Sequence, residues 1–369
     1  MFSLMPFGFL FIFITFFGTI LSLSSLHWLG IWAGLEINLM GFIPILVYSG
    51  MLQETESGMK YFVIQALGSG MIMAGSLFSF SLFLTWESCS IISFTGVVIL
   101  IFGLMLKLGS FPFHFWLPSV MAGISWLSCL VLTTWQKLAP LFLLMTLITV
   151  YASSSSYMLL FLLLAAGGSS LVGGFGGVNQ TQIRALLAYS SISHMGWMLL
   201  CCLTSLSALK IYFATYFIIS ISVFLALWYS EKSLFAQTGS SSSNSKINEL
   251  VLLFMLLSLG GMPPLLGFFS KWIAIWTSCS SVSLLSLAPL LSGSLISLFY
   301  YLSLMFSMSL FSGTHNLTPL LPCPSNPITV MAPTKKYSQP LSFTLLMIMV
   351  INLLGGLFIY GTLPIFDFL

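Results

Sequence analysis

Apolar stretches long enough to cross a lipid bilayer follow one another along almost the whole chain. The hydrocarbon core of a bilayer takes about 20 helical residues, and inside it only α-helices or a closed β-barrel satisfy every backbone hydrogen bond. The strands of a membrane barrel alternate apolar and polar residues, whereas stretches such as Phe7–Leu23 and Leu341–Ile351 are apolar at nearly every position. The sequence therefore predicts an all-α polytopic membrane protein.

Eleven such stretches predict about eleven transmembrane helices. They fall near residues 3–24, 26–50, 57–84, 90–120, 123–149, 155–177, 181–204, 206–232, 246–276, 283–312 and 340–360. We expect one transmembrane bundle over residues 1–360, consisting of a first half at about 1–150, a second half at about 155–312 and a C-terminal helix at about 340–360, followed by a tail at 361–369.

Charged side chains are scarce, and this excludes several classes of function. They make up 5% of the 369 residues, against about 25% in a soluble domain. The net charge of +3 is spread out, and no basic block beyond Lys335–Lys336 suits a nucleic acid. The six cysteines show neither C-x-x-C spacing nor a paired Cys/His motif, which argues against a zinc site, an iron–sulfur cluster or a disulfide framework. We therefore expect lipid around the chain, and no metal, cofactor or nucleic acid bound to it.

The few basic residues also predict the orientation of the chain. Loops after even-numbered spans collect most of them: Lys60, Lys232, Lys246, Lys335 and Lys336, with Arg184 at the edge and anchored at the headgroups. The opposite side has little beyond Lys210. By the positive-inside rule, the N-terminus faces the inner compartment and the C-terminus faces outward. The N-terminus lacks the patterns of a signal or transit peptide, so we interpret the first stretch as a retained span, which in a mitochondrion would mean synthesis inside the organelle.

Two of the stretches, 90–120 and 246–276, are too long for one straight crossing. Each contains a similar short segment with glycine near its start and proline at its end. These segments are Leu108–Pro112 in the first stretch and Leu259–Pro263 in the second, offset by 151 residues. Because proline removes an amide donor and clashes with the preceding turn, both helices should break there. Matching broken helices in two halves are typical of inverted-repeat transporters, with a site near mid-membrane.

Four charged residues lie inside the predicted spans rather than in loops: Glu36, Lys107, Lys137 and Lys271. Each such charge costs about 2.5–3.5 kcal/mol at a helix centre. Four would cost on the order of 10 kcal/mol, which is comparable to the net stability of a domain. Mutual pairing, water or both must offset that cost.

The same physics suggests a function for these charges. Burial favours the neutral form of an ionisable group, while an opposite charge nearby favours the charged form, so a series of such groups joined by water can pass a proton across the membrane. The alternatives are snorkelling for Lys271 and a static ion pair for Glu36. His114 and His194 could continue the proton path, or each could make an ordinary interhelical hydrogen bond.

Several segments resemble the subunit 2 family of NADH–ubiquinone oxidoreductase, respiratory complex I. The resemblance runs from about residue 30 to 275, and its segments are Glu36–Pro44, Lys60–Ala66, Lys107–Gly109, Phe111–Pro118, Thr134–Pro140, Gly177–Gln182, Ala188–Ser191, Gly260–Pro264 and Lys271–Trp272. It implies an antiporter-like bundle in the mitochondrial inner membrane, with the N-terminus in the matrix and the C-terminus in the intermembrane space.

The resemblance also implies roles for individual residues. Glu36 and Lys107 would form a coupled pair, Lys137 a central relay, Lys271 an exit-side lysine, and His114 would line the hydrated axis. NADH, FMN, iron–sulfur clusters and ubiquinone would belong to other chains, so this one would serve as a proton-translocating subunit of an NADH:ubiquinone reductase. Its partners would be the other membrane subunits and lipids.

The sequence departs from that family in two respects. Ser119 follows the Trp-x-Pro segment, where the family often has an acidic residue, and Ala122 stands where a second often follows. The 151-residue offset also maps Glu36 onto Leu187 and Lys137 onto Ala288, so the second half lacks its own pair. Two other functions stay open at this point, namely a free-standing cation/proton antiporter and a membrane scaffold in which buried charges only fix the helix register.

Overall fold

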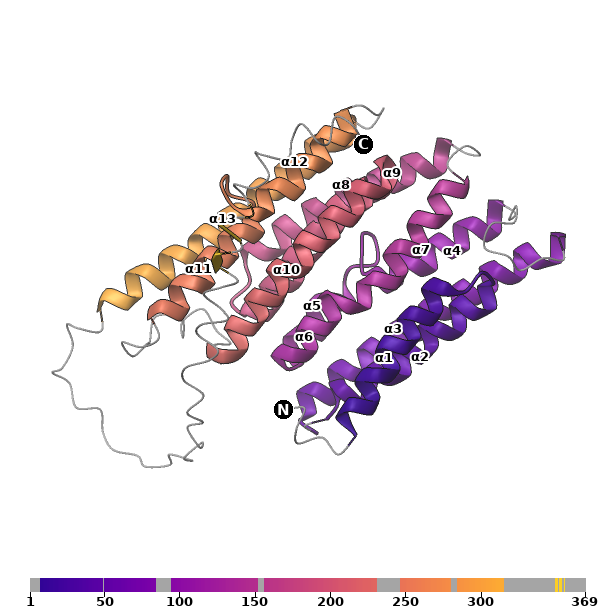
Figure 1. The fold of residues 1–369 in the computed structure, drawn as a ribbon, viewed down its shortest axis with the longest axis horizontal. Helices are drawn as coiled ribbons and strands as arrows, with labels where there is room; N and C mark the ends of the chain where they lie inside the picture. The colour runs from indigo at the N-terminus through magenta and orange to yellow at the C-terminus, as the bar shows by residue number, and fades with distance from the viewer. Residues whose placement is uncertain are drawn as a thin grey trace.

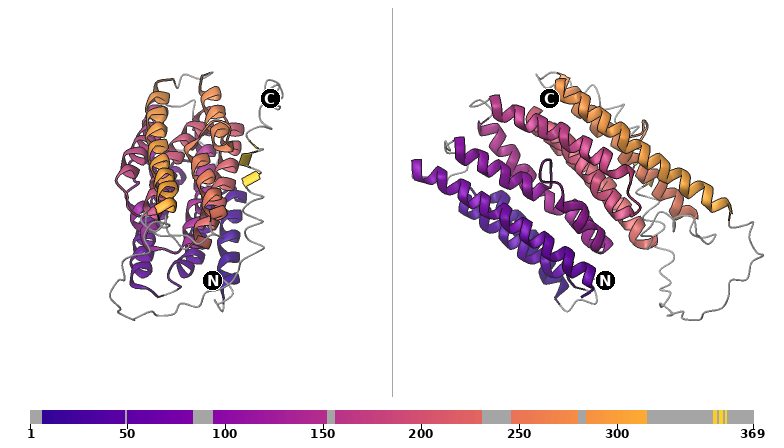
Figure 2. Two further views of the ribbon diagram at one scale, coloured as in Figure 1. Left: turned by 90° about the vertical axis from the view of Figure 1, so that its left-hand side faces the viewer. Right: turned by 180° about the vertical axis from the view of Figure 1, so that it is seen from behind.

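The structure is a computed structural model, and it describes residues 7–48, 50–83, 94–151, 156–230, 246–279 and 284–314, together with Met349, Val350, Asn352, Leu353 and Gly355. Within that part of the chain most residues lie in α-helices and none in a β-strand. The helices lie side by side as long rods, and their order across the bundle broadly follows their order in the chain (Figures 1 and 2).

The first half of the bundle contains α1 (Gly8–Ser24), α2 (Trp28–Leu46), α3 (Leu52–Phe83), α4 (Phe94–Leu108), α5 (Trp116–Gly123), α6 (Trp126–Thr133) and α7 (Trp135–Tyr151). The second half contains α8 (Ser156–Val178), α9 (Ile183–Thr204), α10 (Leu206–Ser230), α11 (Lys246–Gly260), α12 (Leu266–Cys279) and α13 (Leu284–Thr314). The proposed tail and most of the C-terminal span lie outside the described residues, as do the basic residues Lys232, Lys335 and Lys336.

Length and composition support the predicted fold class. Among the described residues, seven helical segments are long and apolar enough to cross a membrane, and three shorter apolar helices cover Gly8–Ser24, Phe94–Leu108 and Val251–Gly260. The prediction of an all-α polytopic membrane protein is therefore confirmed. The span predicted at 57–84 begins earlier, at Leu52, because the polar turn with Glu54 and Glu56 is already helical.

Both predicted breaks are present, and at each the helix ends in the same capping motif. α4 ends before Gly109 (φ +68°) and α11 before Gly261 (φ +82°), each glycine being in the left-handed region that favours this residue. At the first break the amides of Gly109 and Ser110 donate to the carbonyls of Leu106 and Met105 at 3.3 Å each. At the second, the amides of Gly261 and Met262 donate to Ser258 and Leu257 at 3.1 and 3.3 Å. This pair of bonds is the Schellman motif, which closes a helix end.

These motifs correct two details of the prediction. The helices end at the glycines and not at the prolines, which lie two to three residues beyond, where proline commonly follows a finished helix. The structural equivalent of Gly109 is Gly261 rather than Gly260, so the two breaks are 152 residues apart, one more than matching the letters suggests.

The span predicted at 123–149 has a kink that the sequence interpretation missed. α6 ends at Thr133 and α7 begins at Trp135. Both the amide and the hydroxyl of Thr134 donate to the carbonyl of Leu130, at 3.1 and 2.6 Å. Hydroxyls that bond back to their own helix bend it, and here the bend comes three residues before Lys137.

Candidate functional site

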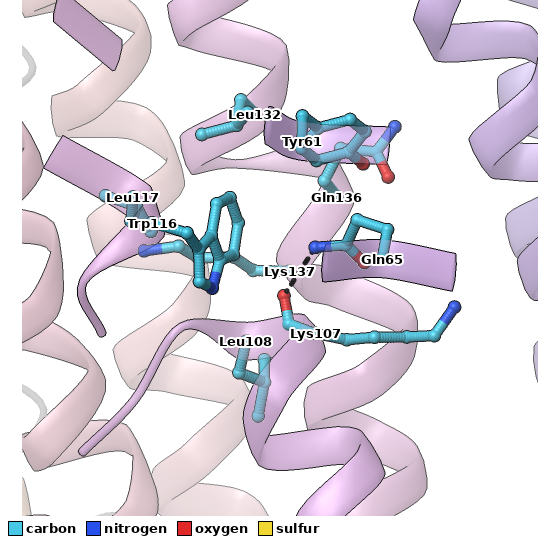
Figure 3. A pocket seen from close by; sticks show the side chains of 9 residues that line it. All are labelled: Tyr61, Gln65, Lys107, Leu108, Trp116, Leu117, Leu132, Gln136 and Lys137. Atoms are coloured by element: carbon cyan, nitrogen blue, oxygen red, sulfur yellow. Dashed lines mark hydrogen bonds between the residues drawn. The ribbon is translucent and has the colours of Figure 1, made fainter. Parts of the chain in front are cut away.

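Two small cavities lie beside α3, α4 and α7, one of them also lined by α5 and α6 and the other by α2, and each has room for about one water molecule. Both are lined by Tyr61, Gln65, Lys107 and Gln136. One of them also contacts Lys137, and in Figure 3 Lys107 of α4 and Lys137 of α7 both line it while their side chains extend in opposite directions. The structure thus brings together two of the charged residues that the sequence placed inside the membrane.

Lys107 lies in the last turn of α4, directly before the first break. Its side chain is 6% exposed, and it packs over Gly68 of α3, where a Cβ atom would lie 2.9 Å from Cγ of the lysine. The neighbouring helix end is well satisfied, because Gln65 donates to the carbonyl of Lys107 at 3.3 Å and Trp116 to that of Leu106 at 3.2 Å. The amine is therefore held beside the cavity by a rigid backbone.

Glu36 is half-buried on α2 and interacts electrostatically with Lys107. Within the described residues the two side chains do not form a direct ion pair. The geometry therefore differs from the static salt bridge that was one of the two interpretations of Glu36.

A pair of amides beside these charges was not predicted. Asn38 of α2 and Gln136 of α7 donate to one another, at 2.8 and 2.9 Å. The two hydrogen bonds join the helix that carries Glu36 to the helix that carries Lys137. A hint in the sequence is that both amides lie deep in apolar stretches, each within two residues of a buried charge.

Lys137 is 2% exposed and lies two residues after the start of α7. Its amine donates to the carbonyl of Ser191 in α9 at 3.3 Å. It also lies 5.9 Å from the ring centre of Tyr216 in α10, within the range of a cation–π interaction. Lys137 therefore borders the cavity of the first half and contacts the helices of the second half.

His194 is buried on α9, between Lys137 and Lys271, and interacts electrostatically with both lysines. Its Nδ1 atom lies 3.0 Å from the hydroxyl of Tyr212, a hydrogen bond whose direction depends on the tautomer. The interhelical bond expected for a structural histidine is present, and the same ring is in electrostatic contact with two of the predicted relay lysines.

Lys271 is 8% exposed on α12. Its amine donates to the carbonyl of Gly260, the last residue of α11, at 2.7 Å. The side chain therefore bridges the second break instead of extending toward the headgroups, so the snorkelling interpretation does not fit its position.

His114 lies in the turn between α4 and α5 and is buried, with its ring near those of Phe111 and Phe115. Its Nδ1 atom has no hydrogen-bond partner among the described residues. It lines neither of the two cavities beside Lys107. Its role in a proton path stays a prediction.

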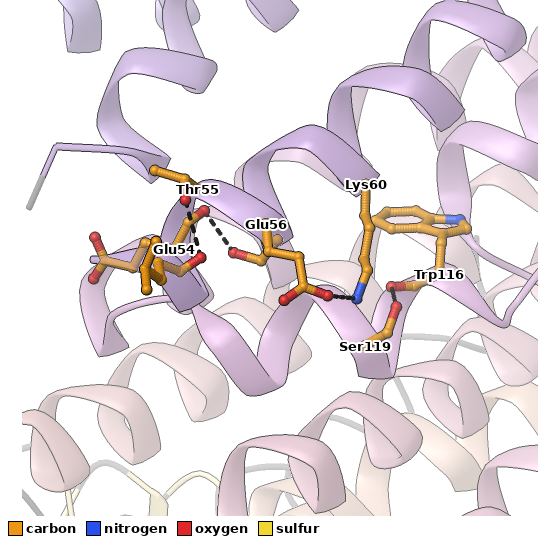
Figure 4. Close-up of polar contacts among 8 residues, drawn as sticks. Glu54, Thr55, Glu56, Lys60, Trp116 and Ser119 are labelled. Atoms are coloured by element: carbon orange, nitrogen blue, oxygen red, sulfur yellow. Dashed lines mark hydrogen bonds and ion pairs between the residues drawn. The ribbon is translucent and has the colours of Figure 1, made fainter. Parts of the chain in front are cut away.

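Two predicted surface features have different outcomes. Lys60 and Glu56 form an exposed i,i+4 ion pair on α3, and Figure 4 shows this pair together with Ser119 of α5. Arg184 lies in the first turn of α9 as expected, and its anchoring at the headgroups stays a prediction. Arg184 donates to the carbonyl of Ile124 at 2.7 Å and stacks 4.9 Å from the ring of Trp126, because the turn between α5 and α6 offers it an acceptor and an aromatic face.

Five ionisable side chains thus come from helices that follow one another across the bundle in Figure 1: Glu36 on α2, Lys107 on α4, Lys137 on α7, His194 on α9 and Lys271 on α12. Glu36 interacts electrostatically with Lys107, Lys107 and Lys137 line one cavity, and His194 interacts electrostatically with Lys137 and Lys271. In the described part of the chain, no three His, Cys, Asp or Glu side chains are grouped as metal ligands. The arrangement is suited to holding and exchanging protons.

Comparisons with known proteins agree with this architecture. Residues 25–297 match the family described as NADH:quinone oxidoreductase/Mrp antiporter, TM. NADH-ubiquinone oxidoreductase chain 2 of Lumbricus terrestris is 41% identical, over 78% of this chain and 83% of the relative. The chain 2 proteins of Myxine glutinosa and Anopheles gambiae are 39% and 37% identical, over 82% and 83% of this chain and 85% and 87% of the relatives.

Solved structures show the same fold at low sequence identity. A chain of respiratory complex I from Thermus thermophilus with bound aureothin has a TM-score of 0.79 at 24% identity, covering 96% of this chain and 79% of that one. A chain of an archaeal membrane-bound sulfane sulfur reductase has a TM-score of 0.81 at 17% identity, covering 97% and 74%. With the family match and the identity to the chain 2 proteins, the chain belongs to the NADH:quinone oxidoreductase/Mrp antiporter family and, within it, to the NADH–ubiquinone oxidoreductase chain 2 family.

Proposed function

We propose that this chain moves protons through the line of Glu36, Lys107, Lys137, His194 and Lys271, as a subunit of an NADH:ubiquinone reductase whose redox steps take place on other chains. The observation that carries the proposal is that Lys107 and Lys137 border one cavity while His194 interacts with both Lys137 and Lys271. This continuity links the two halves of the bundle.

The line can pass a proton because the protonation state of each residue affects the free energy of charging its neighbours. A single charge at the centre of a membrane helix costs about 2.5–3.5 kcal/mol, so holding every lysine charged at once is unfavourable. An opposite charge nearby favours the charged form and a like charge disfavours it. A change at Glu36 therefore alters the balance at Lys107, and Lys107 passes that change on to Lys137 through the cavity between them.

The site of action follows from the family. We infer a location in the mitochondrial inner membrane, with the N-terminus in the matrix and the C-terminus in the intermembrane space, among the other membrane subunits of the complex. NADH, FMN, iron–sulfur clusters and ubiquinone would be bound by those other chains and by the peripheral part of the complex.

Replacing Lys137 by Met tests the proposal directly. In the assembled complex, reconstituted in lipid vesicles, we expect Lys137→Met to lower NADH-driven proton pumping by about 100-fold, in the range of a lost general acid–base group. Lys210→Met is the matched control, because Lys210 is an exposed lysine on α10, and it should pump normally.

The same pair of variants separates the alternatives. A scaffold role predicts that Lys137→Met, once assembly is verified, still pumps at the wild-type rate, and that result would refute the relay. A free-standing antiporter predicts cation-dependent proton exchange by the isolated chain in vesicles without NADH, which the relay within a larger complex does not require.

A further inference from the structure

Two adjacent tyrosines on α13 have no part in the line of charges described above. Tyr300 and Tyr301 are 2% and 1% exposed, and their ring centres are 4.7 Å apart. Neither hydroxyl makes a hydrogen bond of good geometry to any residue that the structure describes, although each lies within weak reach of serine hydroxyls and of the other phenol. Because buried polar groups are nearly always paired with protein or with ordered water, two unpartnered phenols side by side indicate a buried water site.

The surroundings of these phenols are polar and offer acceptors. Tyr301 lies close to Ser190 of α9, and Tyr300 close to Ser193 of α9 and Ser297 of α13. Each serine hydroxyl already donates to a carbonyl three residues back in its own helix, at 2.7–2.8 Å. Each serine therefore presents lone pairs but no proton. A water molecule, which both donates and accepts, would satisfy the phenols and these serines together.

Tyr301 is the member of the pair that lies nearer to the line of charges. The ring of Tyr301 lies against Gly260, where a Cβ atom would be 3.4 Å from Cδ2 of the tyrosine, and the carbonyl of Gly260 accepts the amine of Lys271. Tyr301 also interacts electrostatically with Tyr216, whose ring lies below the amine of Lys137. The pair thus lies beside the line, next to residues that contact Lys137 and Lys271.

Tyr300, the other member of the pair, lies next to the C-terminal end of α8. Tyr300 packs against Gly177, the penultimate residue of that helix, where a Cβ atom would lie 2.7 Å from Cε1 of the ring. Gly173, one turn earlier, makes similar room for the backbone of Ser193, at 2.5 Å. The glycine-rich segment Gly173–Gly177 therefore provides space for the tyrosine and serine cluster.

From these contacts we propose that Tyr300 and Tyr301 bind water and form a side branch of the relay, which connects the α8–α9 end of the bundle with the interval between Lys137 and Lys271. The branch rests on the proposed proton-transfer function. In each transfer a phenol gives its hydroxyl proton to the next oxygen as it takes one from the water behind it, so that O–H bonds broken and formed balance and the phenol stays neutral.

Removing only the hydroxyls tests this branch. In the assembled complex in lipid vesicles, Tyr300→Phe together with Tyr301→Phe should lower the rate of NADH-driven pumping about fivefold, as the loss of one hydrogen-bonded step would, and should enlarge the effect of D2O on that rate. Tyr189→Phe is the matched control, because Tyr189 packs against Gly176 of the same glycine segment, and it should match the wild type in both measurements.

Two results would overturn the branch. One is an unchanged rate and an unchanged D2O effect in the double variant. The other, which does not depend on any variant, is a high-resolution electron microscopy map of the wild-type complex without water density within hydrogen-bond distance of the two phenols. If Lys137→Met abolishes pumping while the double variant is normal, only the branch is wrong. If Lys137→Met pumps normally, the proposed function itself is wrong.

Discussion

The two helix breaks have the same capping motif and use their lysines differently. At the first break, Lys107 precedes the glycine, its side chain lines a cavity, and its amine makes no hydrogen bond to a described residue. At the second, Lys271 follows the glycine, and its amine donates to the carbonyl of Gly260 across the break. The repeat therefore preserves how a helix is interrupted but not where its charge lies.

This difference suggests different roles for the two lysines. An amine beside a water-sized cavity can change its charge with little rearrangement of the protein. An amine that satisfies a buried carbonyl also stabilises the helix end, because an unpartnered buried acceptor costs about 1–3 kcal/mol. We therefore expect Lys107 to contribute mainly to transfer, and Lys271 to contribute to both transfer and stability.

The largest expected effect concerns Lys107. Lys107→Met should lower proton pumping in the assembled complex by about 100-fold, as expected for a missing acid–base group, with little change in thermal stability, since no hydrogen bond from its amine to a described residue is lost. Pumping and the melting temperature of the purified complex are the two measurements. A variant that melts much earlier would show that the amine has a structural partner.

Lys271 should give a mixed result that separates its two roles. Lys271→Met should reduce pumping and also destabilise the region around the second break by about 1–3 kcal/mol, because the carbonyl of Gly260 loses its donor. Lys271→Gln keeps a donor but no titratable amine, so it should recover much of the stability and little of the pumping. Equal recovery of both would contradict the division of roles.

The glycines at the breaks should follow with smaller effects, mainly on stability. Gly109→Ala and Gly261→Ala each force a left-handed conformation on alanine, at a cost of about 1–2 kcal/mol. At Gly261 the new methyl group would also lie 2.8 Å from the amine of Lys271, whereas at Gly109 it would meet Leu117 at 3.0 Å. Thermal unfolding should therefore show similar losses, while pumping should fall further in Gly261→Ala.

Much of this site was predictable from local patterns. The apolar stretches identified the spans, and charges within them identified Glu36, Lys107, Lys137 and Lys271 as buried. Glycine followed by proline located both breaks. These features depend on neighbouring residues and on the bilayer as a solvent, and both can be evaluated from one sequence.

What the sequence did not reveal depends on contacts between distant residues. The amide pair of Asn38 and Gln136 joins positions 98 residues apart, and the acceptor of Lys271 is a backbone carbonyl with no side-chain signature. The register of the repeat was wrong by one residue, because matching letters aligns Gly109 with Gly260, whereas the left-handed conformation belongs to Gly261. Similarly, Arg184 found an acceptor within the protein that hydropathy could not indicate.

The smallest expected effect concerns Lys60, which lies at neither break and serves as a control for the comparison of Lys107 with Lys271. Lys60 forms an ion pair with Glu56 on the surface of α3, and exposed pairs of this kind contribute little because water already solvates both charges. Lys60→Met should therefore leave pumping at the wild-type rate and the melting temperature within experimental error. The same Lys→Met substitution at Lys107 should lower pumping strongly. If the Lys60 variant pumps normally, the loss at Lys107 is due to the buried position of its amine and not to the removal of one positive charge from the chain. A clear loss of pumping in Lys60→Met would instead show that the overall positive charge of the chain affects pumping. The different positions of the lysines at the two breaks would then not explain the effects of replacing them.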